Sequence, residues 1–293
     1  MGTELTRAVI GGILTGGVYA LMAAGLTLIF GVMEIINIAQ GIFVVLAAYL
    51  SYVLQVHFGI DPFLGLLVTM PLMFGVGLLI EWGFVRRLKP QNRSALSILV
   101  TFAVAIVIEG ILTQFFSADL KTLTAWYVDK SWHVLGFYLP YIYLLGFALA
   151  VVLLGALYLF LYRTRTGKSI RASVQNRTGA ELIGININRV SAITFGVGAA
   201  VTAAGGMVFG ATNTFNPNSG YDLISRLLVI IVLGGLGSIG GALVAAVVAL
   251  VIEDVTAVLW SPVWASTMFF AVLVVVLLVR PNGLFGRKEA RAQ

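Results

Sequence analysis

Long apolar stretches follow one another along nearly the whole chain, each separated from the next by a short polar or charged segment. A helix that crosses ~30 Å of hydrocarbon at ~1.5 Å per residue needs about 20 mostly apolar residues. We predict such spans at residues 8–30, 41–56, 62–85, 95–116, 139–162, 190–211, 223–239, 241–259 and 263–279. The pattern predicts an all-α integral membrane protein, a polytopic bundle that forms a single transmembrane domain over residues 1–293.

Glycines interrupt the apolar stretch 223–259. They are Gly234, Gly235, Gly237, Gly240 and Gly241. They divide the stretch into two short helices or a re-entrant pair, so the number of spans is eight or nine. Backbone that is broken at membrane depth must be packed in protein or line a cavity, because lipid cannot satisfy its amides and carbonyls. Gly237 and Gly240 are therefore candidate residues of a solute pathway.

Composition supports a membrane protein. Of 293 residues, 60% are hydrophobic and 10% are charged, with a mean hydropathy of +1.02, whereas soluble domains carry roughly 25% charge. The absence of cysteine excludes disulfides and thiolate metal sites. The net charge of +6 does not indicate nucleic-acid binding, because the basic residues form islands between apolar runs rather than one stripe.

Basic residues gather in three patches that set the expected topology. The patches are Arg86, Arg87, Lys89 and Arg93; then Arg163, Arg165, Lys168, Arg171, Arg177 and Arg189; then Arg280, Arg287, Lys288 and Arg291. The positive-inside rule places all three in the cytoplasm. We therefore predict a cytoplasmic loop at 163–189, a cytoplasmic tail at 280–293, and outer loops at 57–61, 117–137 and 213–222.

Catalytic and nucleotide-binding motifs are not supported by their context. Residues 235–240 match a dinucleotide fingerprint, but apolar segments of spanning length lie on both sides. Gly167, Lys168 and Ser169 end like a phosphate-binding loop, yet the position of its first glycine holds Tyr162. We expect no catalytic residue, no metal site and no cofactor bound by this chain, and thus no enzymatic activity of its own.

Polar residues between the first two predicted spans are candidates for the solute pathway. Asn37 and Gln40 can hydrogen-bond a zwitterionic solute without the desolvation cost of a buried charge, and Glu34 lies close by. The alternative is that they cap the start of a helix. Carboxylates inside spans, with Glu109 the deepest, keep open a different class of protein, an ion-coupled secondary transporter or channel for small polar solutes.

The loop 163–189 places apolar residues among its charges, a pattern typical of a short amphipathic helix. A permease without an ATPase must receive its driving force from a partner, and such a helix offers an apolar face to a groove on that partner. The alternative is an ordinary basic loop.

Four stretches resemble the branched-chain amino acid ABC permeases. Residues 171–186 (RASVQNRTGAELIGIN) resemble the coupling loop of that family, 37–41 (NIAQG) its Asn-x-Ala-(His/Gln)-Gly segment, 234–242 (GGLGSIGGA) its glycine hinge and 280–286 (RPNGLFG) its terminal motif. The resemblance implies a multi-pass permease of the bacterial inner membrane, in contact with membrane lipid, that belongs to an ATP-driven importer.

Further implications of the resemblance concern partners and sites. It implies a second permease subunit, two cytoplasmic ATPase subunits that use ATP, and a periplasmic or lipid-anchored solute-binding protein. Coupling contacts to the ATPase would fall on Arg171, Ala172, Gln175, Asn176, Ala180, Leu182 and Gly184. Some relatives have acidic residues where Gln175 and Asn176 stand. Substrates in the family range from Leu, Ile and Val to other amino acids, amides, urea and organic acids.

Overall fold

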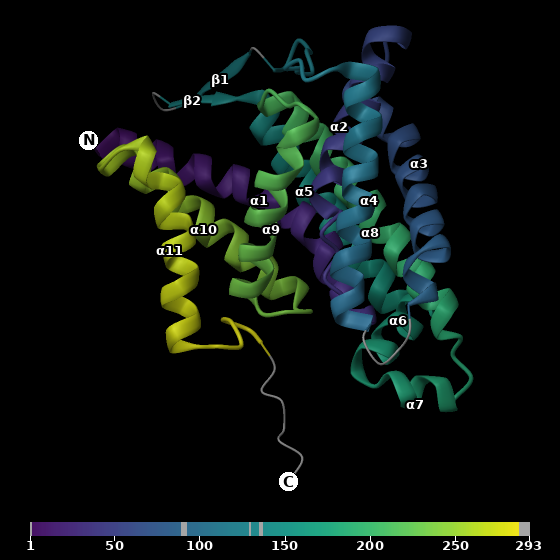
Figure 1. The fold of residues 1–293 in the computed structure, drawn as a ribbon. Helices are drawn as coiled ribbons and strands as arrows, with labels where there is room; N and C mark the ends of the chain where they lie inside the picture. Colours follow the sequence, from purple (N-terminus) through teal and green to yellow (C-terminus); the bar gives the residue numbers. More distant parts are fainter. Residues whose placement is uncertain (1, 89–92, 129, 135–136, 287–293) are drawn as a thin grey trace.

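The computed structural model of the protein describes residues 2–88, 93–128, 130–134 and 137–286, and nearly all of its elements are helices (Figure 1). The longer helices are α1 (Gly2–Met33), α2 (Gln40–Phe58), α3 (Pro62–Gly83), α4 (Arg93–Phe116), α5 (Tyr141–Arg163), α8 (Ile187–Thr212), α10 (Ile239–Leu259) and α11 (Pro262–Val279). The shorter ones are η1 (Val85–Arg87), α6 (Arg165–Gln175), α7 (Arg177–Leu182), η3 (Pro217–Ser219) and α9 (Gly220–Gly234). The predicted all-α class is confirmed.

Eight helices in the described parts of the chain are long and apolar enough to cross a membrane, namely α1 to α5, α8, α10 and α11. The eight-span alternative therefore fits better than nine. The predicted span 223–239 corresponds to α9, whose 15 residues reach only about 22 Å at 1.5 Å per residue. The predicted first span, 8–30, lies within α1, which starts at Gly2 and contains 32 residues.

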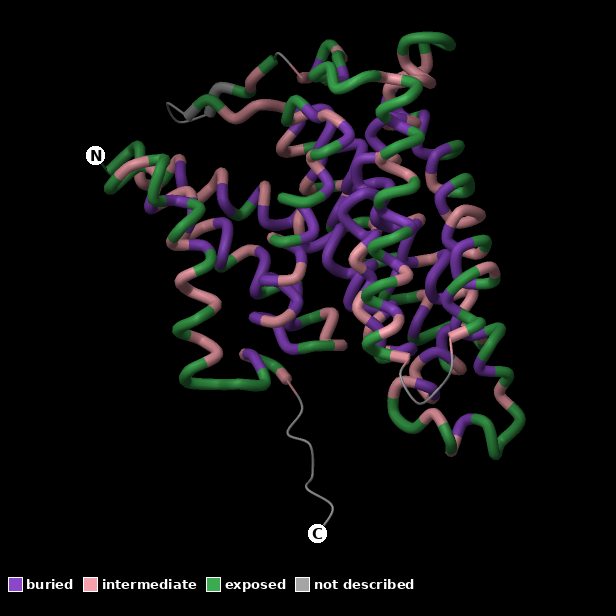
Figure 2. Tube along the Cα trace, in the orientation of Figure 1, coloured by how far each residue is buried: buried purple, intermediate pink, exposed green. Residues whose placement is uncertain are grey.

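Helices α1 and α8 form the centre of the bundle. In each of them 78% of the most apolar window is buried, against 11% in α11. Helix α1 packs on α10, α8 and α5, while α8 also packs on α2 and α3. Figure 2 shows buried residues concentrated along this centre and exposed ones on the outer helices, whose apolar side chains suit contact with lipid.

Glycines allow the close approach of α1 to α10. A Cβ atom on Gly12 would lie 2.5 Å from Cα of Val251, and one on Gly16 would lie 2.7 Å from Cα of Val247. Real Cβ atoms do not approach backbone that closely, so larger residues would push the helices apart. The spacing of four places both glycines on one face of α1, which is how small residues let membrane helices approach closely.

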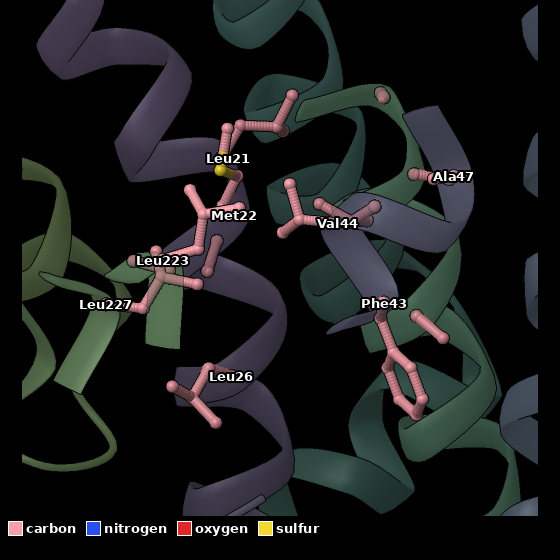
Figure 3. Close-up of a cluster of buried hydrophobic side chains, with 14 of the residues drawn as sticks. Leu21, Met22, Leu26, Phe43, Val44, Ala47, Leu223 and Leu227 are labelled. Carbon is pink, nitrogen blue, oxygen red and sulfur yellow. The ribbon is translucent and has the colours of Figure 1, made fainter. Parts of the chain in front are cut away.

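A cluster of large apolar side chains fills the space between α1, α2 and α9 (Figure 3). Leu21, Met22 and Leu26 of α1 lie opposite Phe43 and Val44 of α2 and next to the first turns of α9. All five of these residues are 0% exposed. The cluster fixes the start of α9 against the centre of the bundle.

The two ends of the bundle differ in structure. Helices α6 and α7 lie at one end with the C-terminal segment, and the strands β1 (Ser131–Val134) and β2 (Phe137–Pro140) lie at the other (Figure 1). The strands pair antiparallel, with Ser131 opposite Pro140. The basic residues of the second predicted patch belong to the α6–α7 end, which by the positive-inside rule we expect to face the cytoplasm.

The outer segment before β1 is fastened to the helices beneath it. Leu123 donates its backbone N–H to the carbonyl of Gly210 over 2.8 Å. Tyr127 donates its hydroxyl to Oδ1 of Asp61, 3.2 Å away, at the start of α3. Burial and then the neighbouring Asp61 raise the pKa of Tyr127, so that its hydroxyl stays protonated as the donor.

Candidate functional site

The break between α1 and α2 carries the first group of predicted pathway residues. Asn37 donates from Nδ2 to Oε1 of Gln40 over 3.0 Å, and Gln40 donates from Nε2 to Oγ1 of Thr202 on α8. Both Asn37 and Gln40 are fully buried. They therefore join the break to α8, and they line neither of the two cavities described below.

Glu34 lies differently from these two amides. It has a left-handed backbone with φ of 54° where α1 ends, and it lines a cavity near the cytoplasmic end of the bundle. Thr101 of α4 supports the same break, because its hydroxyl accepts from the backbone N–H of Ile38 over 3.1 Å. The break thus has one buried side that holds helices together and one residue that faces a cavity.

The glycine hinge, residues 234–241, separates α9 from α10. Gly235 and Gly237 have φ of 94° and 80°, values that residues with a Cβ rarely adopt. Ser238 caps α10 by accepting from the backbone N–H of Gly241 over 3.1 Å. A Cβ atom on Gly240 would meet nothing within 4 Å, because Gly240 lines the inner cavity described below.

The hinge lies against the C-terminal segment. Leu284 and Phe285 donate their backbone N–H groups to the carbonyls of Leu233 and Gly234. A Cβ atom on Gly235 would lie 2.4 Å from the backbone nitrogen of Gly286. The glycine hinge and the terminal motif 280–286, which each resemble a motif of the permease family, therefore pack against each other. Of the predicted tail 280–293, residues 287–293 lie outside the described residues.

An inner cavity of about 920 Å³ lies between α1, α5, α6 and the start of α10. Glu34, Gly237 and Gly240 line it, and so do Arg171 and Gln175 of α6. The structure thus brings together three predicted pathway residues and two predicted coupling residues around one space. Most of the remaining wall is apolar, which suits a solute with an apolar side chain.

Residues 165–182, in the predicted cytoplasmic loop, form two helices rather than the single helix that we predicted. Asn176 ends α6 and starts α7, because its side chain accepts from the backbone N–H of Gly179 over 2.8 Å. Arg171 is fixed to α5, since its Nε donates to the carbonyl of Leu161 over 2.9 Å and its guanidinium lies over the ring of Tyr162.

The other predicted coupling residues differ in accessibility. Ala180 is buried, whereas Leu182 is 83% exposed and the neighbouring Ile183 is 75% exposed. Gly184 follows with a left-handed φ of 86°. Ala172 is half-buried, and Gln175 and Asn176 are exposed. Leu182 and Ile183 thus form an exposed apolar pair at the end of α7.

An outer cavity of about 390 Å³ lies between α1, α5, α8, α9 and α10. Arg226 and Glu253 line it and form an ion pair, with Nη1 2.6 Å from Oε2. Asp222 and Asp254 line it as well. Arg226 was not among the predicted site residues. One signal in the sequence could have identified it, because it is the one lysine or arginine inside the nine predicted spans.

Two further carboxylates in spans have different surroundings. Glu109, the deepest candidate for ion coupling, accepts from the hydroxyl of Tyr221 on α9 over 2.6 Å. Glu81 is 1% exposed, and neither of its oxygens has a hydrogen-bond partner among the described residues. No group of three His, Cys, Asp or Glu side chains that could hold a metal ion occurs in the part of the chain that the structure describes.

Eight potential spans around two cavities define the class, a multi-pass membrane permease. The family model described as branched-chain amino acid transport system / permease component matches residues 8–277, and the chain belongs to this family. It is a permease component of an ATP-driven (ABC) importer in the inner membrane. This family membership supports the importer over the alternative of an ion-coupled transporter or channel.

Relatives of similar length support the assignment. The chain is 28% identical to the high-affinity branched-chain amino acid transport system permease protein BraD of Pseudomonas aeruginosa, over 97% of this chain and 96% of that protein. It is 28% identical to LivH of Escherichia coli, a protein of the same description, over 95% and 94%. These relatives are transport permeases and not enzymes.

A solved structure supports the fold alone. PsaBC from Streptococcus pneumoniae in complex with Fab has a chain that superposes with a TM-score of 0.51 at 11% identity, over 97% of this chain and 98% of that one.

Proposed function

We propose that the chain forms the pathway for branched-chain or related amino acids and that separate ATPase subunits drive it through α6 and α7. One observation carries the proposal: Arg171 and Gln175 of α6 line the same inner cavity as Glu34 and Gly237. A displacement of α6 therefore changes the shape of the space through which the solute passes.

The path from the cytoplasmic surface to the cavity is short. Leu182 and Ile183 of the α7 end offer an apolar contact to a groove on the ATPase subunit. Helix α7 packs on α6. Near the inner cavity, a Cβ atom on Gly31 of α1 would lie 3.6 Å from Cα of Gly237 and 3.9 Å from Val174 of α6. Movement of α6 is thereby transmitted to α1 and to the hinge.

The pathway residues have two roles in this proposal. Glu34, Gly237 and Gly240 form part of the wall of the cavity. Asn37 and Gln40 hold that wall from behind through Thr202. The names of the relatives indicate branched-chain amino acids as the substrates, and the apolar lining of the inner cavity supports this class.

The remaining partners follow from the family. We propose that ATP is bound and hydrolysed by two cytoplasmic subunits, that a second permease subunit completes the membrane part, and that a periplasmic or lipid-anchored binding protein delivers the solute. The experiment is uptake of radiolabelled L-leucine into proteoliposomes that contain the permease with or without its ATPase subunits. Uptake that requires the ATPase and internal ATP supports the proposal, whereas equal uptake without the ATPase contradicts it.

A further inference from the structure

The outer cavity combines charges of both signs with an apolar wall. We propose that it receives the amino acid on the outer side as a zwitterion, with Arg226 binding the carboxylate and with Asp222 and Asp254 binding the ammonium group. This inference rests on the proposed function, because it names the place where the same solute enters.

Arg226 has donors to spare for a carboxylate. It donates from Nη1 to Glu253 over 2.6 Å and from Nη2 to Ser266 of α11 over 3.3 Å. These two bonds leave other N–H groups of the guanidinium, which carries five, without a hydrogen-bond acceptor among the described residues. Because α10 and α11 hold its head group from two sides, the arginine is fixed in place before a ligand arrives, and a guanidinium binds carboxylate with two parallel bonds.

The carboxylates of the cavity supply the opposite charge. Asp222 lies in the first turn of α9 and is exposed, and Asp254 is half-buried on α10. Together with the ion pair of Arg226 and Glu253, the lining carries one positive and three negative groups. An excess of carboxylates disfavours a ligand that is only an anion, and a ligand without a carboxylate leaves the free N–H groups of Arg226 without an acceptor.

The rest of the wall suits an apolar side chain. Val18, Met22, Val208, Leu223 and Leu250 also line the cavity. A volume of about 390 Å³ falls at the lower end of the range of roughly 300–1,000 Å³ found for small-molecule sites. The site therefore offers each of the three chemical parts of a branched-chain amino acid a suitable surface.

The two cavities share helices but no residues. Helices α1, α5 and α10 line the outer cavity at Thr15, Tyr143 and Leu250 and line the inner cavity further along, at residues such as Thr27 and Leu154. The same helices thus form an outer and an inner station, which is the arrangement expected of a path through one permease chain.

The test uses the absence of native cysteine. Thr214 is exposed in the lining of the cavity, and Thr214→Cys in the full chain with its partner subunits is labelled with a membrane-impermeant methanethiosulfonate reagent. L-leucine should slow labelling, while 4-methylpentanoate, which lacks the ammonium group, and 3-methylbutylamine, which lacks the carboxylate, should not. Ala118→Cys, exposed in the outer loop away from the cavity, is the control and should be labelled equally with and without leucine.

A second set of variants tests the ammonium contacts. Asp222→Asn or Asp254→Asn is introduced into the Thr214→Cys chain. Each should raise about tenfold the leucine concentration that gives half-maximal protection from labelling, because each removes a charge-assisted hydrogen bond to the ammonium group. Asp119→Asn, an exposed outer carboxylate 3.6 Å from Lys121, is the matched control and should leave it unchanged.

The outcomes separate this inference from the proposed function. Lack of protection by leucine up to its solubility limit, or equal protection by either analogue, overturns the outer site. Unchanged half-protection in both aspartate variants overturns it too. ATP-dependent leucine uptake is measured on the same preparations, and its persistence in these cases leaves the proposed function standing.

Discussion

Leu284 donates its backbone N–H to the carbonyl oxygen of Leu233 over 2.8 Å, which ties the C-terminal segment to the last turn of α9. Gly235 follows directly and touches the backbone of Gly286. The glycine hinge is consequently held from the cytoplasmic side by the segment that follows α11. A shift of this segment and a shift of the hinge are coupled, because neither backbone can move without breaking these contacts.

Substitution of Gly235 should therefore be far more damaging than substitution of Gly240. Gly235→Ala places a Cβ atom on a backbone with φ of 94° and 2.4 Å from the nitrogen of Gly286. Strain of this kind costs about 1–3 kcal/mol. Gly240→Ala is the matched control, since its Cβ atom meets nothing within 4 Å.

The measurement for the hinge is the thermal unfolding midpoint of the purified permease, read beside leucine uptake. Gly235→Ala should lower both, and Gly240→Ala should leave the unfolding midpoint unchanged. Equal behaviour of the two variants would show that the hinge is not the constrained element described here.

The orientation of the ends can be tested with single cysteines. Thr178 of α7 and Ala118 of the outer loop are both exposed. An impermeant thiol reagent should label Ala118→Cys in intact cells and Thr178→Cys only after permeabilisation, because the basic residues beside α7 place it in the cytoplasm. Labelling of Thr178→Cys in intact cells would reverse the assigned topology.

Gln40 is expected to act through the packing of helices rather than through contact with the solute. Gln40→Met removes its bond to Thr202 and leaves buried polar groups without partners, at a cost of about 1–3 kcal/mol. Uptake should slow without a change in the half-saturating leucine concentration. Gln114→Met, at an exposed position of α4, is the control. A raised half-saturating concentration with an unchanged unfolding midpoint would instead indicate a direct contact with solute.

The pair of Arg226 and Glu253 should show strong coupling in a double-mutant cycle. Arg226→Gln leaves the mostly buried carboxylate of Glu253 unpaired, which costs up to roughly 3–5 kcal/mol. The double variant Arg226→Gln/Glu253→Gln removes both charges and should recover most of that loss in the free energy of unfolding. If the loss of unfolding free energy in the double variant equals the sum of the losses in the two single variants, the ion pair contributes no coupling energy to the fold.

The spans could be predicted from sequence because hydrocarbon thickness sets their length. The eight helices match predicted windows, with errors at the ends. Helix α9 was harder, since its residues are apolar like those of a span, yet it has only 15 of them and ends at Gly234, where the following Gly235 takes a φ of 94°. The division of α6 from α7 was missed because the cap at Asn176 is one hydrogen bond within a continuous amphipathic pattern.

The sites could be predicted only in part. Glu34 and Gly237 share a cavity with Arg171, but no sequence spacing relates residues from three separate segments. Gln40 and Asn37 were identified as polar residues of interest, yet their partner Thr202 lies on α8, far along the chain. Arg226 could have been predicted as a site residue, because a lone cation in an apolar run needs a carboxylate nearby.

Ala180 and Leu182 test the coupling surface in different ways. Ala180 is 3% exposed, so a large charged residue there would disturb the segment itself. Leu182 is 83% exposed, so Leu182→Glu places a charge on the docking surface and leaves the fold of this chain intact. Leu182→Met is the matched control, because it keeps an apolar side chain of similar size.

The most direct measurement of the central claim is solute-stimulated ATP hydrolysis by the reconstituted importer, read beside capture of its ATPase subunits by the tagged permease. Leu182→Glu should weaken capture at least about tenfold, as expected for loss of an apolar anchor in an interface, and should abolish stimulation. Leu182→Met should retain both. Full capture and full stimulation in the Leu182→Glu importer would contradict coupling through α6 and α7.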